Sequence, residues 1–208
     1  MKKRPILFSA PMVRAILAGS KTQTRRVLKG STEHRGPYNP AYVEAHRNSA
    51  GWATICPYGA PGDRLWVREA YRFDRQFDAL TPRRVPPGSP FFMEASLADW
   101  LGGPHDGEPG KLRPSMFMPR WASRITLEVT EVRVERLQDI SEADALAEGV
   151  WTGQPEMLAA GAGGMNLNHR SAYASLWEQI NGPASWDANP WVWAISFKRV
   201  HENTGVSS

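Results

Sequence analysis

Cysteine is almost absent from this sequence, with Cys56 the single example among 208 residues. One cysteine excludes an internal disulfide framework and any zinc or iron–sulfur site built from several thiolates. The five histidines are scattered, and no two of them stand at the spacing of a metal-ligand pair. We therefore expect a reducing, cytoplasmic location, and neither a metal nor another cofactor.

Long apolar runs are also missing. No stretch approaches the roughly 20 residues that a membrane-spanning helix needs, so we expect no membrane association. The basic start at residues 1–4 precedes an apolar stretch, as in a signal peptide, but Pro5, Pro11 and Arg14 interrupt that stretch. No GxGxxG or GxxxxGK[ST] motif is present, which disfavours doubly wound and P-loop folds.

The sequence does contain enough apolar material for a buried core, with 41% hydrophobic residues and 9 Trp. Its formal net charge of +4 is distributed unevenly. Residues 1–47 hold ten Lys or Arg and two Asp or Glu, a net of +8, so the remaining residues sum to −4. This excess suggests an anionic partner, nucleic acid first, although an ordinary solvated surface explains the same counts.

Hydrophobic periodicity predicts an α+β fold with short strands and helices at both ends of the chain. The expected helices are residues 10–18, 142–148 and 170–180, and the expected strands are residues 5–9, 52–55, 64–68, 91–93, 122–136 and 191–197. We expect a single domain over residues 1–200, with insertions at about 28–61, 74–114 and 151–168 and a frayed tail at 201–208.

The most informative segment is Leu17-Ala-Gly-Ser-Lys-Thr-Gln-Thr-Arg-Arg26. It reads as a helix end followed by clustered cations and hydroxyls, which suit contact with an oxyanion or a phosphate. A polar strand in solvent is the alternative interpretation of the same residues.

This segment resembles the signature of ASCH domains, which belong to the PUA-like superfamily. Three further segments follow in the family's order: Gly-Asp-Arg-Leu-Trp-Val at 62–67, the alternating strand at 125–134, and Trp-Val-Trp-Ala-Ile-Ser-Phe-Lys at 191–198. The layout is similar to the larger ASCH proteins of phage and prophage genomes. The resemblance implies a small PUA-like β-barrel flanked by helices, with long inserted loops and with RNA or a modified base held beside the barrel.

The resemblance also implies candidate site residues. One ASCH branch hydrolyses N4-acetylcytidine with a Lys, a Thr and a Glu, which match Lys21, Thr24 and Glu148. Burial and neighbouring cations would lower the pKa of such a lysine from its usual value near ~10.4, so that it could act as a base. We expect the substrate or nucleic acid to be bound by Thr22, Arg25, Arg26, Lys29, Trp66 and Glu69.

Three functions stay open at this point: an amidohydrolase acting on N4-acylated cytidine, a module that binds RNA or a modified base without chemistry, and a ribonuclease. We expect RNA or a modified nucleoside as partner and favour a monomer. A carboxylate from Glu148 close to Lys21 would favour acid–base chemistry. Lys21 and Thr24 stand three residues apart, so on a regular strand they point to opposite faces unless the backbone bends.

Overall fold

The computed structural model describes residues 1–29, 38–96, 107–150 and 168–200. The chain divides into two compact units: unit 1 comprises Met1–Ala18, Gly62–Glu128 and Lys198–Ser208, and unit 2 comprises Gly19–Pro61 and Val129–Phe197. Both contain helices and strands, which confirms the predicted α+β class.

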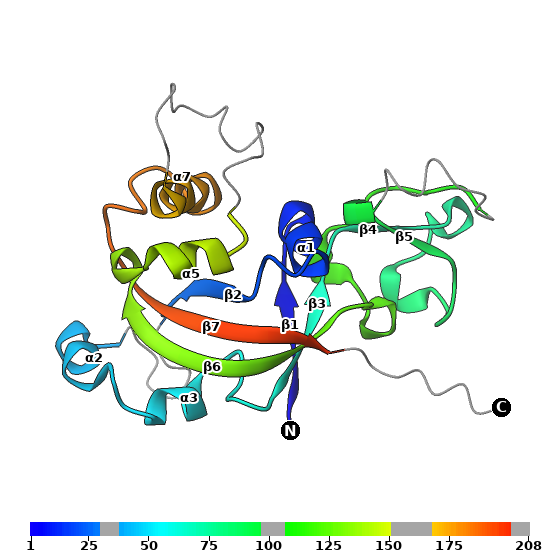
Figure 1. Ribbon diagram of the computed structural model, residues 1–208. Coiled ribbons are helices and arrows are strands. Elements are labelled where there is room, and N and C mark those ends of the chain that lie inside the picture. Colours follow the sequence, from blue (N-terminus) through cyan, green and yellow to red (C-terminus); the bar gives the residue numbers. More distant parts are fainter. Residues whose placement is uncertain (30–37, 97–106, 151–167, 201–208) are drawn as a thin grey trace. The chain divides into compact units, whose positions relative to one another are not determined.

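The sheet of unit 1 begins with β1 (Lys3–Leu7), which lies parallel to β3 (Arg64–Arg68) and pairs Pro5 with Trp66. The first residues of β6 (Thr126–Arg136) pair with β3 in the antiparallel direction. Helix α1 (Ala10–Leu17) buries Val13 and Ile16 and lies beside these strands (Figure 1). It ends just before Gly19, whose φ of 79° is a conformation that favours glycine.

The rest of unit 1 holds a two-stranded sheet of β4 (Tyr71–Phe73) and β5 (Phe91–Met93). These strands pack in a separate apolar cluster with Val85, Met118 and Ala122. The described part of the predicted insertion at 74–114 is therefore ordered around its own core. Short 3₁₀ turns connect it: η1 (Arg75–Phe77), η2 (Pro82–Arg84), η3 (Glu94–Ser96), η4 (Ser115–Phe117) and η5 (Arg120–Ala122).

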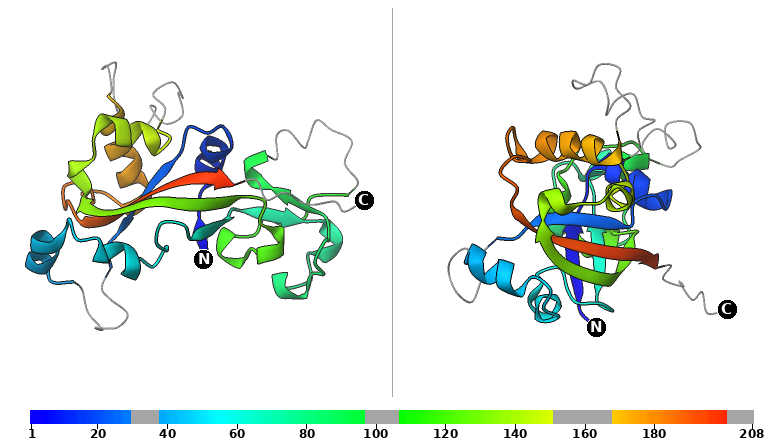
Figure 2. Two further views of the ribbon diagram at one scale, coloured as in Figure 1. Left: turned by 60° about the horizontal axis from the view of Figure 1, so that its bottom comes forward. Right: turned by 60° about the vertical axis from the view of Figure 1, so that its left-hand side comes forward.

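In unit 2, helices cover both faces of the strands. Strand β2 (Gln23–Val27) pairs antiparallel with β7 (Trp191–Val200). Helices α5 (Glu142–Ala147) and α7 (His169–Asn181), with the short turn η6 (Leu137–Asp139), lie on one face. Helices α2 (Pro40–His46) and α3 (Gly51–Ile55) lie on the other face (Figures 1 and 2).

The apolar core of unit 2 forms where α5 and α7 meet the strands. Its buried members include Leu137, Ala145, Tyr173, Trp177 and Val192, which come from four different elements. This packing places the last turn of α5 directly over β2, and that placement creates the site described below.

Hydrogen bonds connect the strands of the larger sheet in the order β1-β3-β6-β7-β2, with β6 passing from unit 1 into unit 2. Within the described residues, β1 and β2 stand at the two ends of this order. The sheet therefore does not close into the predicted barrel, although the mixed α+β architecture stands.

One predicted element is wrong. Residues 52–55 form the end of helix α3, not a strand. The Ser49 hydroxyl accepts from the Gly51 N–H, and the Trp52 ring packs edge-on against Trp193 at 5.8 Å. A short apolar run does not distinguish strand from helix by its periodicity, so the local hydrogen bond to Ser49 and the tertiary contact with Trp193 decide. The predicted insertion at 151–168, apart from Asn168, and the tail at 201–208 lie outside the described residues.

Candidate functional site

The candidate site forms where the start of β2 meets the end of α5. Lys21 and Glu148 pair as an isolated antiparallel bridge, and the Thr22 N–H donates to the Ala147 carbonyl at 2.8 Å. Helix α5 begins at Ser141, whose side chain accepts from the Asp144 N–H and caps the helix. The chain therefore brings together two segments more than 120 positions apart in the sequence.

The Lys21 ammonium is fully enclosed by protein. Its Nζ donates to Glu148 Oε2 at 2.7 Å, to the Glu148 carbonyl at 2.8 Å and to the Gln23 carbonyl at 2.8 Å. The side chains of Lys21 and Glu148 are 0% and 3% exposed. An ammonium has three N–H donors, and these three acceptors satisfy all of them.

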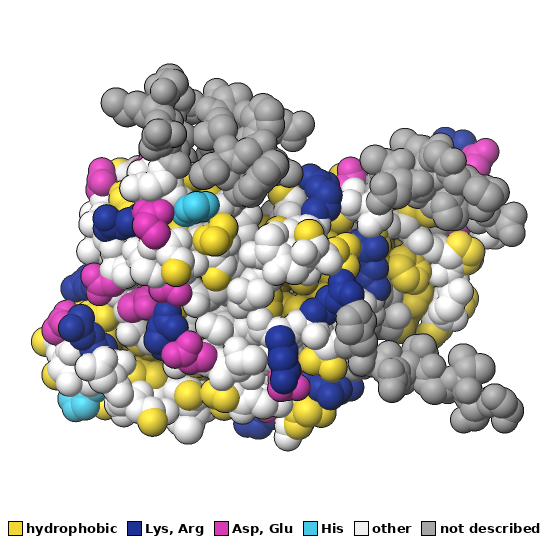
Figure 3. Space-filling model, viewed as in Figure 1, with side chains coloured by type: hydrophobic (Ala, Val, Ile, Leu, Met, Phe, Trp, Pro, Cys, Tyr) yellow, Lys and Arg dark blue, Asp and Glu magenta, His cyan; other side chains and the backbone are white. Residues whose placement is uncertain are grey.

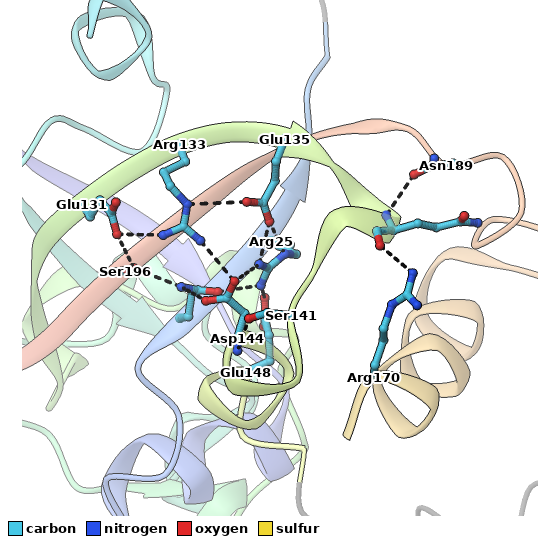
Figure 4. Close-up of polar contacts among 12 residues, drawn as sticks. Arg25, Glu131, Arg133, Glu135, Ser141, Asp144, Glu148, Arg170, Asn189 and Ser196 are labelled. Atoms are coloured by element: carbon cyan, nitrogen blue, oxygen red, sulfur yellow. Dashed lines mark hydrogen bonds and ion pairs between the residues drawn. The ribbon is translucent and has the colours of Figure 1, made fainter. Parts of the chain in front are cut away.

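Arg25 lies two residues after Gln23 on β2 and joins the same cluster. Its Nε and Nη2 donate to Glu135 Oε1 at 2.8 and 2.6 Å. Its Nη1 donates to Gln23 Oε1 at 2.6 Å and to Glu148 Oε1 at 3.2 Å (Figure 4). The Glu148 carboxylate therefore bridges two cations, Lys21 and Arg25, inside the protein.

Arg133 and Asp144 extend this arrangement. Asp144 Oδ2 lies 3.3 Å from Nη2 of Arg25 and 3.3 Å from Nη2 of Arg133. Arg133 Nε lies 3.5 Å from Glu135 Oε2. We refer to the six charged side chains as the ion-pair network: Lys21, Arg25, Arg133, Glu135, Asp144 and Glu148. Arg133 Nη1 also lies 2.8 Å from Oε2 of the exposed Glu131, so a further carboxylate flanks the network where Arg133 reaches the surface.

Burial lowers the pKa of Lys21, and the charges of Arg26 and Arg25 lower it further, whereas the Glu148 carboxylate opposes both effects. For Asp144, burial acts to raise the pKa, but the hydrogen bond from Gln23 and the two nearby guanidiniums outweigh it and lower the pKa. Ionisable groups perturbed in this way are concentrated at functional sites, although structural ion pairs perturb them too.

The alternation of β2 separates the predicted site residues into two sets. Gln23 and Arg25 point toward α5, whereas Thr24 pairs with Ile195 and points to the other face, as does Arg26, which pairs with Trp193. Thr24 is buried, and among the described residues its hydroxyl makes no hydrogen bond to Lys21 or Glu148. The structure therefore joins Lys21 to Glu148 but does not join Thr24 to them.

The other predicted residues lie in different surroundings. Thr22 and Lys29 are exposed at the two ends of β2. Trp66 and Glu69 belong to unit 1. The buried Glu69 carboxylate accepts two hydrogen bonds from the guanidinium of Arg124, at 2.9 and 3.1 Å, so Glu69 is held by an ion pair of its own.

Sequence reasoning missed Gln23, Arg133, Glu135 and Asp144. The Gln23 amide donates to Asp144 Oδ1 and to the Ser196 hydroxyl, both at 3.1 Å, and so links α5 to β7. Residues 21, 23 and 25 share one face of a strand, and this period-two pattern was a signal for Gln23 in the sequence. The choice of carboxylate partners from β6 and α5 had no comparable local signal.

No model of a known protein family matches this sequence. No curated protein matches it either. Among solved structures, the chain is similar to a crystal structure of an ASCH domain from Lactobacillus crispatus JV V101, at 12% identity over 97% of this chain and 81% of that chain, with a TM-score of 0.38. A likeness at this TM-score supports no argument about fold or function.

The described residues also give two negative findings. Within residues 1–29, 38–96, 107–150 and 168–200, no group of three or more His, Cys, Asp or Glu side chains is placed to hold a metal ion. Across the same ranges, no helix has both the length and the apolar character to cross a membrane.

Proposed function

We propose that this chain is an ASCH-type protein that binds RNA or a modified nucleoside, and that it hydrolyses the exocyclic amide of an N4-acylated cytidine. The observation that carries this proposal is the 2.7 Å contact between Lys21 Nζ and Glu148 Oε2 in a buried site. The resemblance to ASCH domains assigns these same two residues to catalysis from sequence segments that lie far apart.

The buried pair suits proton transfer in such a hydrolysis. Water adds its oxygen to the acyl carbon, the C–N bond breaks, and one proton passes to the departing cytidine amine. In the unbound protein the Lys21 side chain is 0% exposed, so this mechanism requires substrate binding to open the Lys21–Glu148 contact to the attacking water. A neutral Lys21 amine then takes a proton from that water, and Glu148 relays a proton to the leaving nitrogen.

Thr24, unlike Lys21 and Glu148, has no catalytic role in this proposal. Because its side chain points to the opposite face of β2, we take water as the nucleophile and give Thr24 no step. Thr24→Val keeps the shape and removes the hydroxyl, so it tests this assignment. We expect an unchanged rate of hydrolysis. A large loss of rate would show that the Thr24 hydroxyl takes part in the reaction.

The test is incubation of the full chain with a panel of N4-acylated and other modified nucleosides and short RNAs, followed by mass detection of products. Lys21→Met and Glu148→Gln should each lower the rate by about 10²–10⁴-fold if these residues are general acid–base groups. Glu108→Gln is the control, because it removes a carboxylate of unit 1 from an exposed ion pair.

Circular dichroism is needed beside the rates, since both variants alter a buried charge. If either variant is unfolded, the wild-type pH–rate profile provides the second measurement. If Lys21 acts as a general base, the rate depends on pH, because only the neutral amine accepts a proton. Hydrolysis that persists in both folded variants, or a flat profile, would overturn the mechanism.

A binding module without chemistry is the second candidate. The observation that favours it is the complete satisfaction of the Lys21 ammonium by protein acceptors, with no part of the side chain exposed. In that case Lys21 and Glu148 only connect α5 to β2. Wild-type protein that binds but converts no nucleoside would support this candidate.

A further inference from the structure

The positive charge of the protein belongs to one of its two units. Counted over the sequence, unit 1 contains 16 Lys or Arg and 10 Asp or Glu, a net of +6. Unit 2, which contains the ion-pair network, contains 9 Lys or Arg and 11 Asp or Glu, a net of −2. Figure 3 shows Lys and Arg gathering over α1 and β3, whereas basic and acidic side chains mix over α5 and β6. An anionic partner is therefore attracted to unit 1.

Within unit 1, two guanidiniums lie against one aromatic ring. Arg68 Cζ lies 4.9 Å and Arg120 Cζ 5.7 Å from the centre of the Trp66 indole. Trp66 and Arg68 share a face of β3, and Arg120 comes from η5. Trp66 and Arg68 are half-buried and Arg120 is exposed, so solvent reaches this cluster.

Among the described residues, most N–H donors of these two arginines make no hydrogen bond. The Arg68 Nε and Nη2 donate to the Met118 carbonyl at 3.3 and 3.1 Å, which fixes the plane of its guanidinium and uses two of its five N–H donors. In the part of the chain that the structure describes, neither Arg68 nor Arg120 forms an ion pair with a carboxylate. Other arginines of unit 1 do pair with carboxylates, for example Arg72 with Glu94 and Arg75 with Glu108.

Holding two guanidiniums beside one ring without a counter-charge costs free energy in the unbound protein. An anion that contacts either guanidinium reduces this cost, and the indole offsets part of it beforehand through cation–π attraction. A planar guanidinium matches phosphate oxygens with two parallel hydrogen bonds. A planar guanidinium or indole also provides a surface on which an unpaired base can stack.

We infer that Trp66, Arg68 and Arg120 form a binding site for the backbone and bases of single-stranded nucleic acid. This inference does not depend on the proposed hydrolysis, which uses residues of unit 2. Trp66 is one of the residues that the sequence predicts to bind substrate or nucleic acid. This inference gives its ring a further role, the support of two phosphate-binding guanidiniums.

The test is fluorescence anisotropy of the full chain with labelled oligouridine and oligothymidine of equal length over a series of salt concentrations. The double variant R68Q/R120Q should flatten the slope of log affinity against log salt by about 1.4, since each single-strand phosphate contact contributes about 0.7. The matched control is R83Q/R84Q, which removes the same charge from exposed arginines of unit 1. Its slope should stay close to the wild-type value.

Two more variants keep the result interpretable. W66L changes no charge, so weaker binding by this variant shows that the ring itself contributes. R120Q alone alters an exposed side chain, and it should flatten the slope by about 0.7 even if the Arg68 variant does not fold. Hydrolysis of free nucleosides, where present, should persist in R68Q/R120Q, which separates this inference from the proposed activity.

Three outcomes would overturn the inference. Equal slopes for R68Q/R120Q and R83Q/R84Q would show that only net charge matters. Polyglutamate that competes as well as the oligonucleotide would indicate an acidic protein partner. Inorganic phosphate that displaces the oligonucleotide fully at millimolar concentration would indicate a site for a small anion.

Discussion

Glu148→Gln removes the charge that lies between Lys21 and Arg25 and keeps the size of the side chain. In the wild-type protein the carboxylate contacts the two cations at 2.7 and 3.2 Å, and the Lys21 and Arg25 side chains are both 0% exposed. The variant leaves the Lys21 ammonium, whose side chain is 0% exposed, without its carboxylate partner. Breaking a buried pair in this way costs about 3–5 kcal/mol, and we expect the free energy of unfolding to fall by that amount.

The measurement is urea denaturation at pH 7 followed by circular dichroism, with the slope m compared between variants. Glu108→Gln is the matched control, because the Arg75–Glu108 pair has nearly the same length, 2.9 Å, but its side chains are 72% and 71% exposed. An exposed pair contributes only about 0–1 kcal/mol. The contrast between the two variants therefore measures the effect of burial on similar ion pairs.

The double variant Lys21→Met with Glu148→Gln completes a thermodynamic cycle. Once Lys21 is neutral, removing the Glu148 charge no longer leaves an ammonium buried without its partner. The double variant should therefore lose less stability than the sum of the two single variants, by about 0.5–3 kcal/mol. The reasoning fails if Glu148→Gln costs no more than Glu108→Gln, or if the single effects add within about 0.5 kcal/mol.

Three further predictions concern stability. Ser141→Ala removes the hydroxyl that accepts from the Asp144 N–H at 3.0 Å and should cost about 1 kcal/mol in urea denaturation, whereas an unchanged midpoint would contradict the cap. The pKa of Asp144 is lower in the folded protein than the unfolded value near ~3.9, so its ionised carboxylate contributes stability above that value and loses it as pH falls further. Asp144→Asn should therefore reduce the fall in the free energy of unfolding at acid pH. Burial raises the pKa of Tyr71 to about 12, and its hydroxyl donates to the Phe117 carbonyl at 3.0 Å. Tyr71 therefore contributes stability that is present below about pH 10 and declines toward pH 12, and Tyr71→Phe should remove this alkaline decline.

Local sequence signals located many of the elements. Pro11 and Gly19 mark the two ends of α1, because a fixed proline φ and a left-handed glycine act within a few residues of the chain. Ser9 occupies the N-cap position, as its residue type predicts, but its side chain makes no capping hydrogen bond. Alternation at 191–197 indicates β7 for the same reason, since the side-chain period of a strand is a local property. These signals do not depend on which partner each element finds.

Local signals were insufficient where long-range packing decides. Residues 52–55 are apolar enough for a strand, but the edge-on contact of Trp52 with Trp193 fixes them as part of a helix. The open strand order is likewise a property of pairings between distant segments. The charge excess at residues 1–47 pointed toward Arg25, yet Arg25 is buried among carboxylates, and the net positive charge belongs to unit 1.

For the site, the sequence by itself determined the period-two rule that divides residues 21–26 between two faces. Its resemblance to ASCH domains implied Lys21 and Glu148 as candidates. The tertiary structure decided which face each residue occupies and which carboxylates from β6 and α5 meet it. The physical reason is that strand alternation is set by neighbouring backbone geometry. Charge compensation in a buried network instead depends on side chains from several segments, which come together only when the chain is folded.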